Sequence, residues 1–286
     1  MEFMAIGSGN AFTKKNWQSN FLITQNGKRL MIDCGTYSWL AMDELKLTTG
    51  DIDAVYISHL HADHCGGLEE LMFTTYFNPT LKRPTLFCEG AYVKDTDIGI
   101  IHSSGLVKEL WDNVLCGGAR GLEGVEATLD TFFDVKPVKA NKSFTWEGIT
   151  FDIIQTIHIS SKYKIEHSFG LMWTDPDTKE RVYLTTDSQF CPVNAMKAYL
   201  REANVIFHDC ETSPYASGVH AHYNELRMLA PEIKQKMWLY HFQDNVITNW
   251  DEWEQKAKDD GFLGFVKTHG RFIRKYDIQE TGKIGK

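Results

Sequence analysis

The feature that most constrains this chain is a short run with four side chains able to bind metal, His59-Leu60-His61-Ala62-Asp63-His64. His59 and His61 alternate along an extended segment, so their imidazoles point to the same side and can share one ion. Asp63 and His64 follow where the chain turns into a helix, and the change of backbone direction sends them toward a second ion. The alternative is a polar loop whose histidines only form hydrogen bonds. The run therefore predicts two half-built metal sites.

Three later residues are candidates to complete these sites: His158, Asp187 and His241. Each ends a β-rich run, where a sheet would present it at one edge. Taken alone, each fits a structural polar residue better, because strand ends often carry polar groups. Together with the first cluster, they complete a set of ligands for two ions.

Length and composition narrow the class of protein. The chain has 286 residues, and we expect a single domain spanning 1–286. No apolar run is long enough to cross a membrane, and the first ten residues do not resemble a secretory signal. The six cysteines form no CxxC pair, which favours reduced thiols in a cytoplasm. The net charge of −8 disfavours a large nucleic-acid substrate, because such affinity depends on Lys and Arg neutralising many phosphates.

Short β-rich runs alternate with amphipathic helical stretches in both halves, which predicts an α/β fold, a four-layer αββα sandwich. Asn26-Gly27 and residues 146–149 mark tight turns. A less regular segment at about 76–134 is expected to form a lid or a subunit contact. The predicted strands cover 3–6, 21–24, 30–33, 54–57, 85–88, 144–146, 149–155, 170–173, 182–185, 205–208 and 237–240, and the predicted helices cover 67–75, 106–115, 192–202 and 224–236.

The order H-x-H-x-D-H, then His, then Asp, then His resembles the metallo-β-lactamase superfamily over the whole chain. The resemblance implies that His59, His61 and His158 bind one metal. It implies equally that Asp63, His64 and His241 bind the other, with Asp187 bridging the two. Because an aspartate and not a cysteine stands at position 187, the set is more similar to the phosphodiesterase branch than to the β-lactamases.

Further motifs resemble tRNase Z and its relatives: residues 7–16, 19–22 and 32–35 near the start, and later His208-Asp209-Cys210-Glu211-Thr212 and Val219-His220-Ala221-His222. By this resemblance Asp209 holds His220, and His220 donates a proton to the leaving oxygen. His222 is the rival donor, since the alignment can slip by two residues. The alternative without a catalytic role places both histidines on a solvent-facing turn.

Two departures argue against tRNase Z itself: the chain is acidic, and residues 67–158 contain no long Gly-Pro-rich arm for grasping tRNA. The chain is most similar to the phage-type anti-Pycsar phosphodiesterases. That likeness implies hydrolysis of 3′,5′-cyclic pyrimidine and purine nucleotides to nucleoside monophosphates, with Asp63 also helping to deprotonate water. Tyr215, Tyr163 and Trp39 are candidates for stacking on the base, although aromatic residues are more often core packing.

The same likeness implies two divalent ions, zinc or alternatively manganese, a homodimer, no membrane partner, and the host cytoplasm if the protein is phage-encoded. The alternative functions are a tRNase Z-like RNA 3′-processing endonuclease and a thioester or lactone hydrolase, because a dimetal centre alone does not choose between carbonyl and phosphoryl substrates. A non-enzymatic alternative is a metal-stabilised module that sequesters its ligand.

Overall fold

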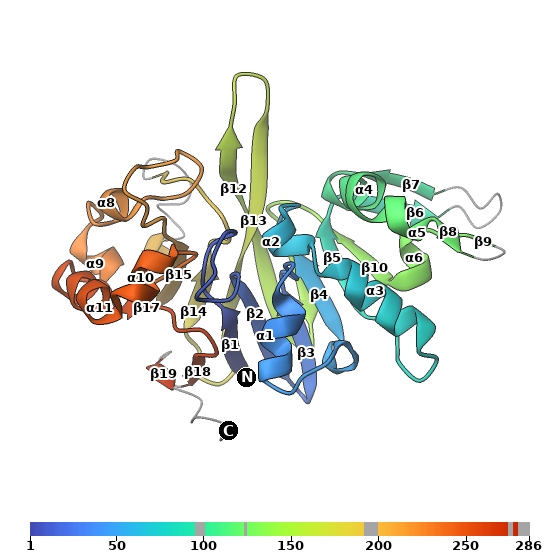
Figure 1. The fold of residues 1–286 in the computed structure, drawn as a ribbon, viewed down its shortest axis with the longest axis horizontal. Coiled ribbons are helices and arrows are strands. Elements are labelled where there is room, and N and C mark those ends of the chain that lie inside the picture. Colours follow the sequence, from blue (N-terminus) through green and yellow to red (C-terminus); the bar gives the residue numbers. More distant parts are fainter. Residues whose placement is uncertain (95–100, 123–124, 192–199, 274–276, 280–286) are drawn as a thin grey trace.

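The computed structural model describes residues 1–94, 101–122, 125–191, 200–273 and 277–279, and the account below concerns these residues. Two large sheets lie face to face at the centre, and helices cover their outer faces (Figure 1). The predicted four-layer αββα sandwich is therefore confirmed. In the described ranges, no helix combines the length and apolar character needed to span a bilayer.

The first sheet has the order β10-β5-β4-β3-β2-β1-β18-β19. Its strands are β1 (Glu2–Gly7), β2 (Asn20–Gln25), β3 (Lys28–Ile32), β4 (Ala54–Ile57), β5 (Thr85–Glu89), β10 (Asp134–Val138), β18 (Arg271–Ile273) and β19 (Asp277–Gln279). β3, β4, β5 and β10 run parallel to one another. The carboxyl ends of these strands therefore meet at one edge of the sheet.

The second sheet has the order β11-β12-β13-β14-β15-β16-β17. Its strands are β11 (Ser143–Trp146), β12 (Ile149–Ser160), β13 (Ile165–Thr174), β14 (Arg181–Leu184), β15 (Val205–Asp209), β16 (Met237–Tyr240) and β17 (Gly264–Phe265). From β14 to β17 the strands are parallel, so again their carboxyl ends share one edge. The β12–β13 hairpin projects well beyond the rest of the molecule at the top of Figure 1.

The helices are short. They are α1 (Ser38–Glu44), the 3-10 helix η1 (Thr49–Asp51), α2 (Ala62–Cys65), α3 (Leu68–Phe77), α4 (Leu106–Glu109), the π-helix η2 (Leu110–Leu115), α5 (Cys116–Ala119), α6 (Leu129–Phe132), α8 (Tyr223–Leu226), α9 (Pro231–Lys234), α10 (Asp244–Thr248) and α11 (Trp250–Asp259). Two small hairpins, β6 (Ala91–Lys94) with β7 (Ile101–Ser104) and β8 (Gly121–Leu122) with β9 (Val125–Glu126), lie in the middle segment.

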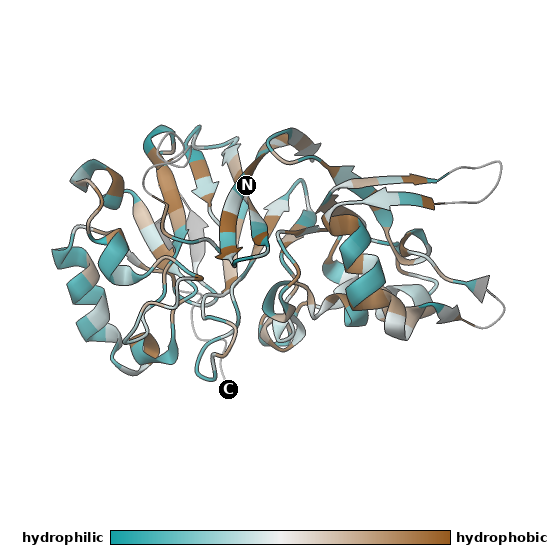
Figure 2. Cartoon of the chain, turned by 90° about the horizontal axis from the view of Figure 1, so that it is seen from above, coloured by the Kyte–Doolittle hydropathy of each residue, from teal (hydrophilic) through white to brown (hydrophobic). Residues whose placement is uncertain are grey.

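Burial of apolar side chains holds the layers together. The core between the sheets contains stacked and edge-on aromatic rings, with Phe3 of β1 against Phe207 of β15 at 5.0 Å between ring centroids. A second core lies under α1 and α3, and a third lies under α8 to α11. Figure 2 shows the same division, with hydrophobic residues concentrated on the strands and hydrophilic residues on the outlying helices. The sheets are thus covered on both faces, as the sandwich requires.

All predicted strands occur, but one helical prediction needs correction. The helix predicted over 224–236 is wrong, because α8 and α9 are separate helices and Pro231 lies at the first turn of α9. Proline lacks the N–H that a helix interior requires, so one continuous helix cannot pass through it. The helix predicted over 192–202 lies outside the described residues up to 199, and Leu200–Glu202 are helical.

Candidate metal centre

The candidate residues lie at the edge where the parallel strands of both sheets end. The run that begins at His59 follows β4, Asp187 follows β14 and His241 follows β16 directly. Loops at the carboxyl ends of parallel strands are the usual place for ligands in α/β folds, because the chain there leaves the sheet with its side chains free to converge. Pairing between distant strands therefore collects residues that are far apart in the sequence.

His158 differs from its predicted position. The sequence placed it at the end of a strand, but β12 continues to Ser160 and His158 lies inside it. The pairing of β12 with β13 shifts between Ile157 and Ile159, which makes His158 the extra residue of a β-bulge. A bulge bends the strand and redirects the unpaired side chain. In this case the redirected imidazole reaches the metal-binding run.

Backbone hydrogen bonds fix the metal-binding run against the loop after β3. Cys34 N donates to His64 O at 2.7 Å, and Gly67 N donates to Cys34 O at 2.8 Å. The two segments approach so closely that a Cβ on Gly35 would lie 2.0 Å from the carbonyl oxygen of Asp63. Only glycine fits such an approach. A larger residue at position 35 would therefore push the loop after β3 away from the histidine run.

The first group of candidate ligands is His59, His61, His158 and Asp187. His61 Nδ1 lies 3.1 Å from His59 Nε2 and 3.0 Å from His158 Nε2. Asp187 Oδ2 lies 3.8 Å from His59 Nε2 and 3.8 Å from His158 Nε2. Four ligands about 2.1 Å from one tetrahedral ion are about 3.4 Å apart. The observed separations match this geometry.

The second group is Asp63, His64, Asp187 and His241. Asp63 Oδ2 lies 3.2 Å from His64 Nε2 and 3.3 Å from His241 Nε2. Asp187 Oδ2 lies 3.2 Å from His64 Nε2 and 3.4 Å from His241 Nε2. The same oxygen of Asp187 therefore belongs to both groups. The structure brings together all seven predicted side chains.

Unsatisfied polar atoms show that the residues fit divalent cations. His64 Nε2 and Asp187 Oδ1 are buried and have no hydrogen-bond partner in the described part of the chain. A buried polar atom without a partner is costly, and a coordinated cation removes that cost. Imidazole nitrogens and carboxylate oxygens are suitable ligands for divalent ions such as zinc. Both groups thus have the composition and spacing of a metal site.

A further carboxylate positions the ligands and was given no role from the sequence. Asp33 Oδ2 lies 2.8 Å from His64 Nδ1, and the same carboxylate accepts hydrogen bonds from the N–H and the hydroxyl of Ser58 at 2.8 Å each. Ser58 Oγ in turn lies 3.0 Å from His59 Nδ1. Such partners fix the orientation of ligating imidazoles. Asp33 and Ser58 follow the neighbouring parallel strands β3 and β4, so the rule of shared strand ends could have identified them.

Asp209, at the end of β15, connects the metal groups to His220. Its Oδ2 lies 2.7 Å from His220 Nδ1 and accepts the Ser188 N–H at 2.9 Å. Its Oδ1 lies 3.5 Å from His241 Nδ1. His220 is close to the candidate ligands, with its ring centroid 4.6 Å from that of His241. Asp209 therefore orients the candidate proton donor and lies beside one candidate ligand.

The rival donor, His222, has a different environment. Its Nε2 lies 2.9 Å from the carbonyl oxygen of Ser213, and its Nδ1 accepts the N–H of Asn224 at the start of α8. Both ring nitrogens are thus used within the helix cap. His222 belongs to none of the candidate metal groups, whereas His220 lies in a third group with Asp187, Asp209 and His241. The geometry favours His220 of the two.

Burial and neighbouring charges set the protonation of these groups. Burial lowers the pKa of His158 to about 4, so its imidazole is neutral and able to coordinate a cation. Burial raises the pKa of Asp187, but the imidazoles of His241 and His64 beside it bring the pKa well below its ordinary value. Burial also acts to lower the pKa of His220. The neighbouring Asp209 carboxylate outweighs burial, so the pKa of His220 is raised above its ordinary value. His220 is therefore poised to carry a proton.

A cavity of about 380 Å³ opens beside the first group. Its lining includes His61, His158 of β12 and His167 of β13 on one side, and Leu106 and Glu109 of α4 on the other. α4 of the middle segment therefore forms one wall of the space next to the candidate ions. Tyr163 and Tyr215 are highly exposed, but Trp39 is buried and donates to Gly67 O, so its prediction as a stacking residue is wrong.

Comparison with known proteins agrees with this geometry. A sequence model of the family described as "Anti-Pycsar protein Apyc1" matches residues 1–272. The chain is 33% identical over 247 residues to the Anti-Pycsar protein Apyc1 of Paenibacillus harenae, which covers 86% of this chain and 91% of the relative. It is 30% identical over 256 residues to the protein of the same name from Bacillus phage vB_BveM-Goe7, covering 84% and 88% of the two chains.

Solved structures share the fold. The metallo-β-lactamase fold protein YhfI from Bacillus subtilis superposes with a TM-score of 0.64 at 19% identity, covering 94% of this chain and 97% of its own. The short form of human tRNase Z superposes with a TM-score of 0.65 at 15% identity, covering 96% and 99%. The architecture is therefore that of the metallo-β-lactamase fold, as the sequence resemblance implied.

Proposed function

The chain belongs to the Anti-Pycsar protein Apyc1 family, and from this premise we propose that it is a metal-dependent phosphodiesterase that hydrolyses 3′,5′-cyclic nucleotides to nucleoside monophosphates. Its role is counter-defence against cyclic nucleotide signalling. The observation that carries the proposal is the sharing of Asp187 by two ligand groups, with His220 beside them. The two ligand groups would hold two cations beside the proton donor, so that one phosphodiester could reach all three.

We propose that the candidate ligands divide between two ions. His59, His61 and His158 would hold one ion, Asp63, His64 and His241 would hold the other, and Asp187 would bridge them. When bound, the two ions would supply Lewis acidity that stabilises charge on the phosphoryl oxygens and makes water a nucleophile near neutral pH. The protein keeps these side chains fixed and buried, so little reorganisation accompanies the reaction.

His220 would protonate the leaving oxygen. Its Nδ1 is hydrogen-bonded to Asp209, so the proton available to a substrate is on Nε2, and the side chain remains 19% exposed to the site. As the bond between phosphorus and the ribose 3′ oxygen breaks, the proton of Nε2 passes to that oxygen. A water adds its oxygen to phosphorus, and Asp63, whose Oδ2 faces the site, assists in removing a proton from that water.

The finer properties belong to the same proposal. We expect zinc in both sites, with manganese as the alternative, since imidazole nitrogens and carboxylate oxygens are zinc ligands, three and one in the first group and two and two in the second. We expect a homodimer in which the segment 76–134 acts as a lid or a subunit contact. The enzyme would act in a cytoplasm, the host cytoplasm if it is phage-encoded, and its six cysteines are free thiols.

The substrate class can be tested directly. Purified protein is incubated with a panel of cyclic purine and pyrimidine monophosphates, a precursor tRNA and a model thioester, each with and without EDTA. We expect metal-dependent conversion of the cyclic nucleotides to monophosphates. Cleavage of the precursor tRNA alone would assign the chain to RNA processing, and thioester hydrolysis alone would assign it to the carbonyl hydrolases. Binding of a cyclic nucleotide without turnover would identify a sequestering module instead.

A further inference from the structure

The cavity beside the first ligand group has one wall that the proposed mechanism does not use. This wall is β13, where Ile165, His167 and Phe169 alternate along the strand and all line the cavity. Alternate residues of a strand face the same side, so these three side chains form one surface. The cavity, with a volume of about 380 Å³, is within the size range of small-molecule sites, about 300–1,000 Å³. A substrate held at the ions would therefore extend along β13.

His167 has one ring nitrogen that the protein holds and one that it does not. Its Nδ1 lies 3.0 Å from the carbonyl oxygen of Thr156. A carbonyl oxygen only accepts hydrogen bonds, so the proton of the neutral imidazole is on Nδ1 and Nε2 is left as an acceptor. Within the described ranges of the chain, Nε2 has no hydrogen-bond partner. The lining of the cavity thus contains an imidazole acceptor of fixed tautomer without a donor from the protein.

The carboxylates of the same lining are less suited to read a substrate. Glu89 Oε2 accepts the backbone N–H at the start of α4 at 3.2 Å, and Glu166 Oε1 lies 3.6 Å from Lys164 Nζ. Glu109 is exposed on α4. His167 is half-buried, and its ring is held through Nδ1. A fixed and partly buried acceptor discriminates more strongly between ligands, because leaving it unpaired is costly.

Strand pairing places His167 near the reacting end of the site. It pairs with Ile157 of β12, the residue that precedes the candidate ligand His158. The ring of His158 lies 5.1 Å, between centroids, from the ring of His220. The candidate proton donor and the acceptor on His167 are therefore neighbours of the same ligand.

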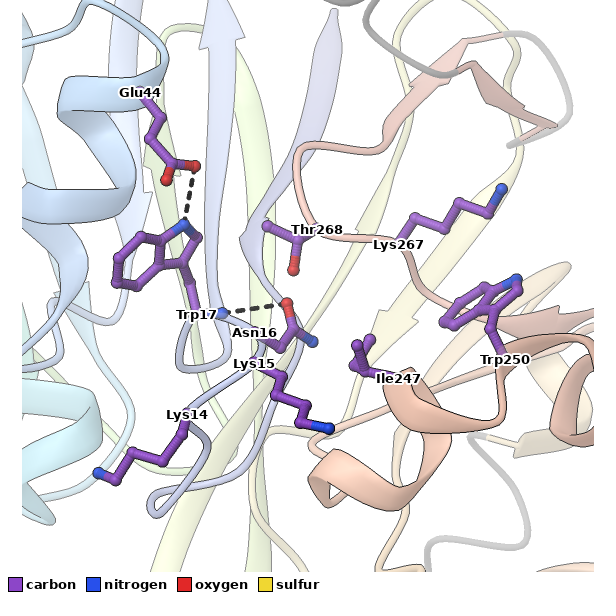
Figure 3. Close-up of a pocket in the computed structure, with 9 residues that line it drawn as sticks. All are labelled: Lys14, Lys15, Asn16, Trp17, Glu44, Ile247, Trp250, Lys267 and Thr268. Atoms are coloured by element: carbon purple, nitrogen blue, oxygen red, sulfur yellow. Dashed lines mark hydrogen bonds between the residues drawn. The ribbon is translucent and has the colours of Figure 1, made fainter.

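A larger cavity elsewhere in the molecule does not offer this combination. It has a volume of about 540 Å³, and its lining is drawn in Figure 3. Lys14 Nζ donates to Tyr37 Oη at 3.3 Å, and Lys15 Nζ donates to Thr248 Oγ1 at 2.8 Å. The side chains of Lys14 and Lys267 point apart in Figure 3. Its lining includes none of the candidate metal ligands, so the cavity along β13 is the one that a substrate at the ions enters.

The chemistry of a cyclic nucleotide matches the order of residues along the site. In a 3′,5′-cyclic nucleotide the 3′ and 5′ oxygens are both bonded to phosphorus, so the 2′-hydroxyl is the one hydroxyl of the sugar. It lies on the carbon next to the one that carries the 3′ oxygen, which His220 would protonate. A hydroxyl donates a hydrogen bond to an unprotonated imidazole nitrogen. His167 Nε2 would meet this hydroxyl when the phosphoryl group lies at the ions.

We propose that His167 makes the site specific for ribonucleotides, because its Nε2 accepts a hydrogen bond from the 2′-hydroxyl of the cyclic nucleotide. This role rests on the proposed function, since it requires a cyclic nucleotide at the ions. An analogue without the 2′-hydroxyl leaves Nε2 unpaired in a partly buried site. Sites built to bind a hydroxyl reject such analogues strongly. His167 takes no part in bond breaking and is a specificity-determining residue.

The test compares adenosine 3′,5′-cyclic monophosphate with its 2′-deoxy analogue on the metal-loaded, full-length protein. The value of kcat/KM for the ribonucleotide should exceed that for the analogue by about tenfold or more. In His167→Phe, which keeps a planar ring without an acceptor, this ratio should fall to about twofold or less. His167→Gln, whose amide oxygen accepts hydrogen bonds, should keep an intermediate ratio. Equal values for the two nucleotides in the unmodified protein would overturn the proposal, and so would an unchanged ratio in His167→Phe.

Glu109→Gln is the matched control, because it changes another acceptor in the lining of the same cavity. Its ratio should equal that of the unmodified protein, and loss of the ratio in this variant instead of His167→Phe would overturn the assignment. Failure of the proposed function gives a different result, namely no conversion of either nucleotide in the presence of metal. The dissociation constants of the two nucleotides, measured by calorimetry, then test the contact with the 2′-hydroxyl, and equal constants would overturn it.

Discussion

Among single residues, Asp187 connects the most parts of the site, because one of its oxygens lies within 3.8 Å of five imidazole nitrogens. Asp187→Ala should abolish hydrolysis, a loss of roughly 10³-fold or more, since both sites would lose a shared ligand. Metal content by mass spectrometry should fall in the same variant while circular dichroism stays unchanged. The control is Asp43→Ala, an exposed aspartate on α1, which should retain both metal and activity. Full activity of Asp187→Ala in metal-replete buffer would refute the assignment.

His220 and His222 provide a matched pair two residues apart. His220→Ala should slow cyclic nucleotide turnover by about 10²–10⁴-fold, the usual contribution of a general acid, with little loss of metal. His222→Ala should remove a helix cap, costing about 1 kcal/mol of unfolding free energy, and leave the rate nearly unchanged.

A substrate with a good leaving group distinguishes proton donation from a structural role of His220. The p-nitrophenolate ion leaves without protonation, so His220→Ala should affect bis(p-nitrophenyl) phosphate far less than a cyclic nucleotide. Equal rate losses on the two substrates, or metal loss in proportion to rate loss, would count against the proposed role.

At the level of elements, Asp244 ties the loop after β1 to the start of α10. Its carboxylate accepts hydrogen bonds from the Thr13 hydroxyl at 2.6 Å and from the N–H groups of Lys14 and Lys15 at 2.8 and 3.2 Å. Partial burial raises the pKa of Asp244, but these three donors outweigh that effect and lower it. The loop after β1 is therefore fastened by an ionised carboxylate.

This fastening should depend on pH. Because the folded pKa of Asp244 is depressed, its stabilisation is fully present above the unfolded pKa of about 3.9 and is lost as pH falls through the folded value. Asp244→Asn should lower the free energy of unfolding by about 1 kcal/mol at pH 7. The difference between the two proteins in urea unfolding should shrink below pH 4. A difference that stays constant from pH 7 to pH 3 would contradict this account.

The elements also show where local sequence patterns are sufficient. The predicted strands 54–57 and 237–240 coincide with β4 and β16, because continuous apolar β-branched and aromatic runs are typical of buried parallel strands. The bulge at His158 had no local signal, since it depends on how β12 pairs with β13. The helix α11 was not predicted, although its first turn is acidic and its last turn basic. That charge pattern could have revealed it.

At the scale of the whole molecule, stability depends on the core between the two sheets. Phe207 of β15 is fully buried and contacts Phe3 and Phe21 of the opposite sheet. Phe207→Ala should lower the free energy of unfolding by about 3–5 kcal/mol, because it leaves a cavity where the sheets meet. Urea unfolding measures this loss. The control Phe12→Ala, whose side chain is 81% exposed, should change stability by less than about 0.5 kcal/mol. Similar losses in both variants would contradict the packing argument.

The sequence by itself determined the ligand types, the layer architecture and the family. Motif spacing placed four candidate ligands on one short run, and alternation of strand and helix patterns predicted the sandwich, because both depend on residues near one another in the chain. The single-domain boundaries and the roles of the site residues remain predictions.

Only the tertiary structure decided which distant residues meet. The pairing of parallel strands brought Asp187 and His241 to the run at His59, and Asp33 to His64. The packing of the loop after β1 on α10 brought Asp244 to Thr13, and the packing of α1 on the first sheet buried Trp39. These contacts depend on the pairing of distant strands and on burial, and neither can be predicted from a local pattern of residues.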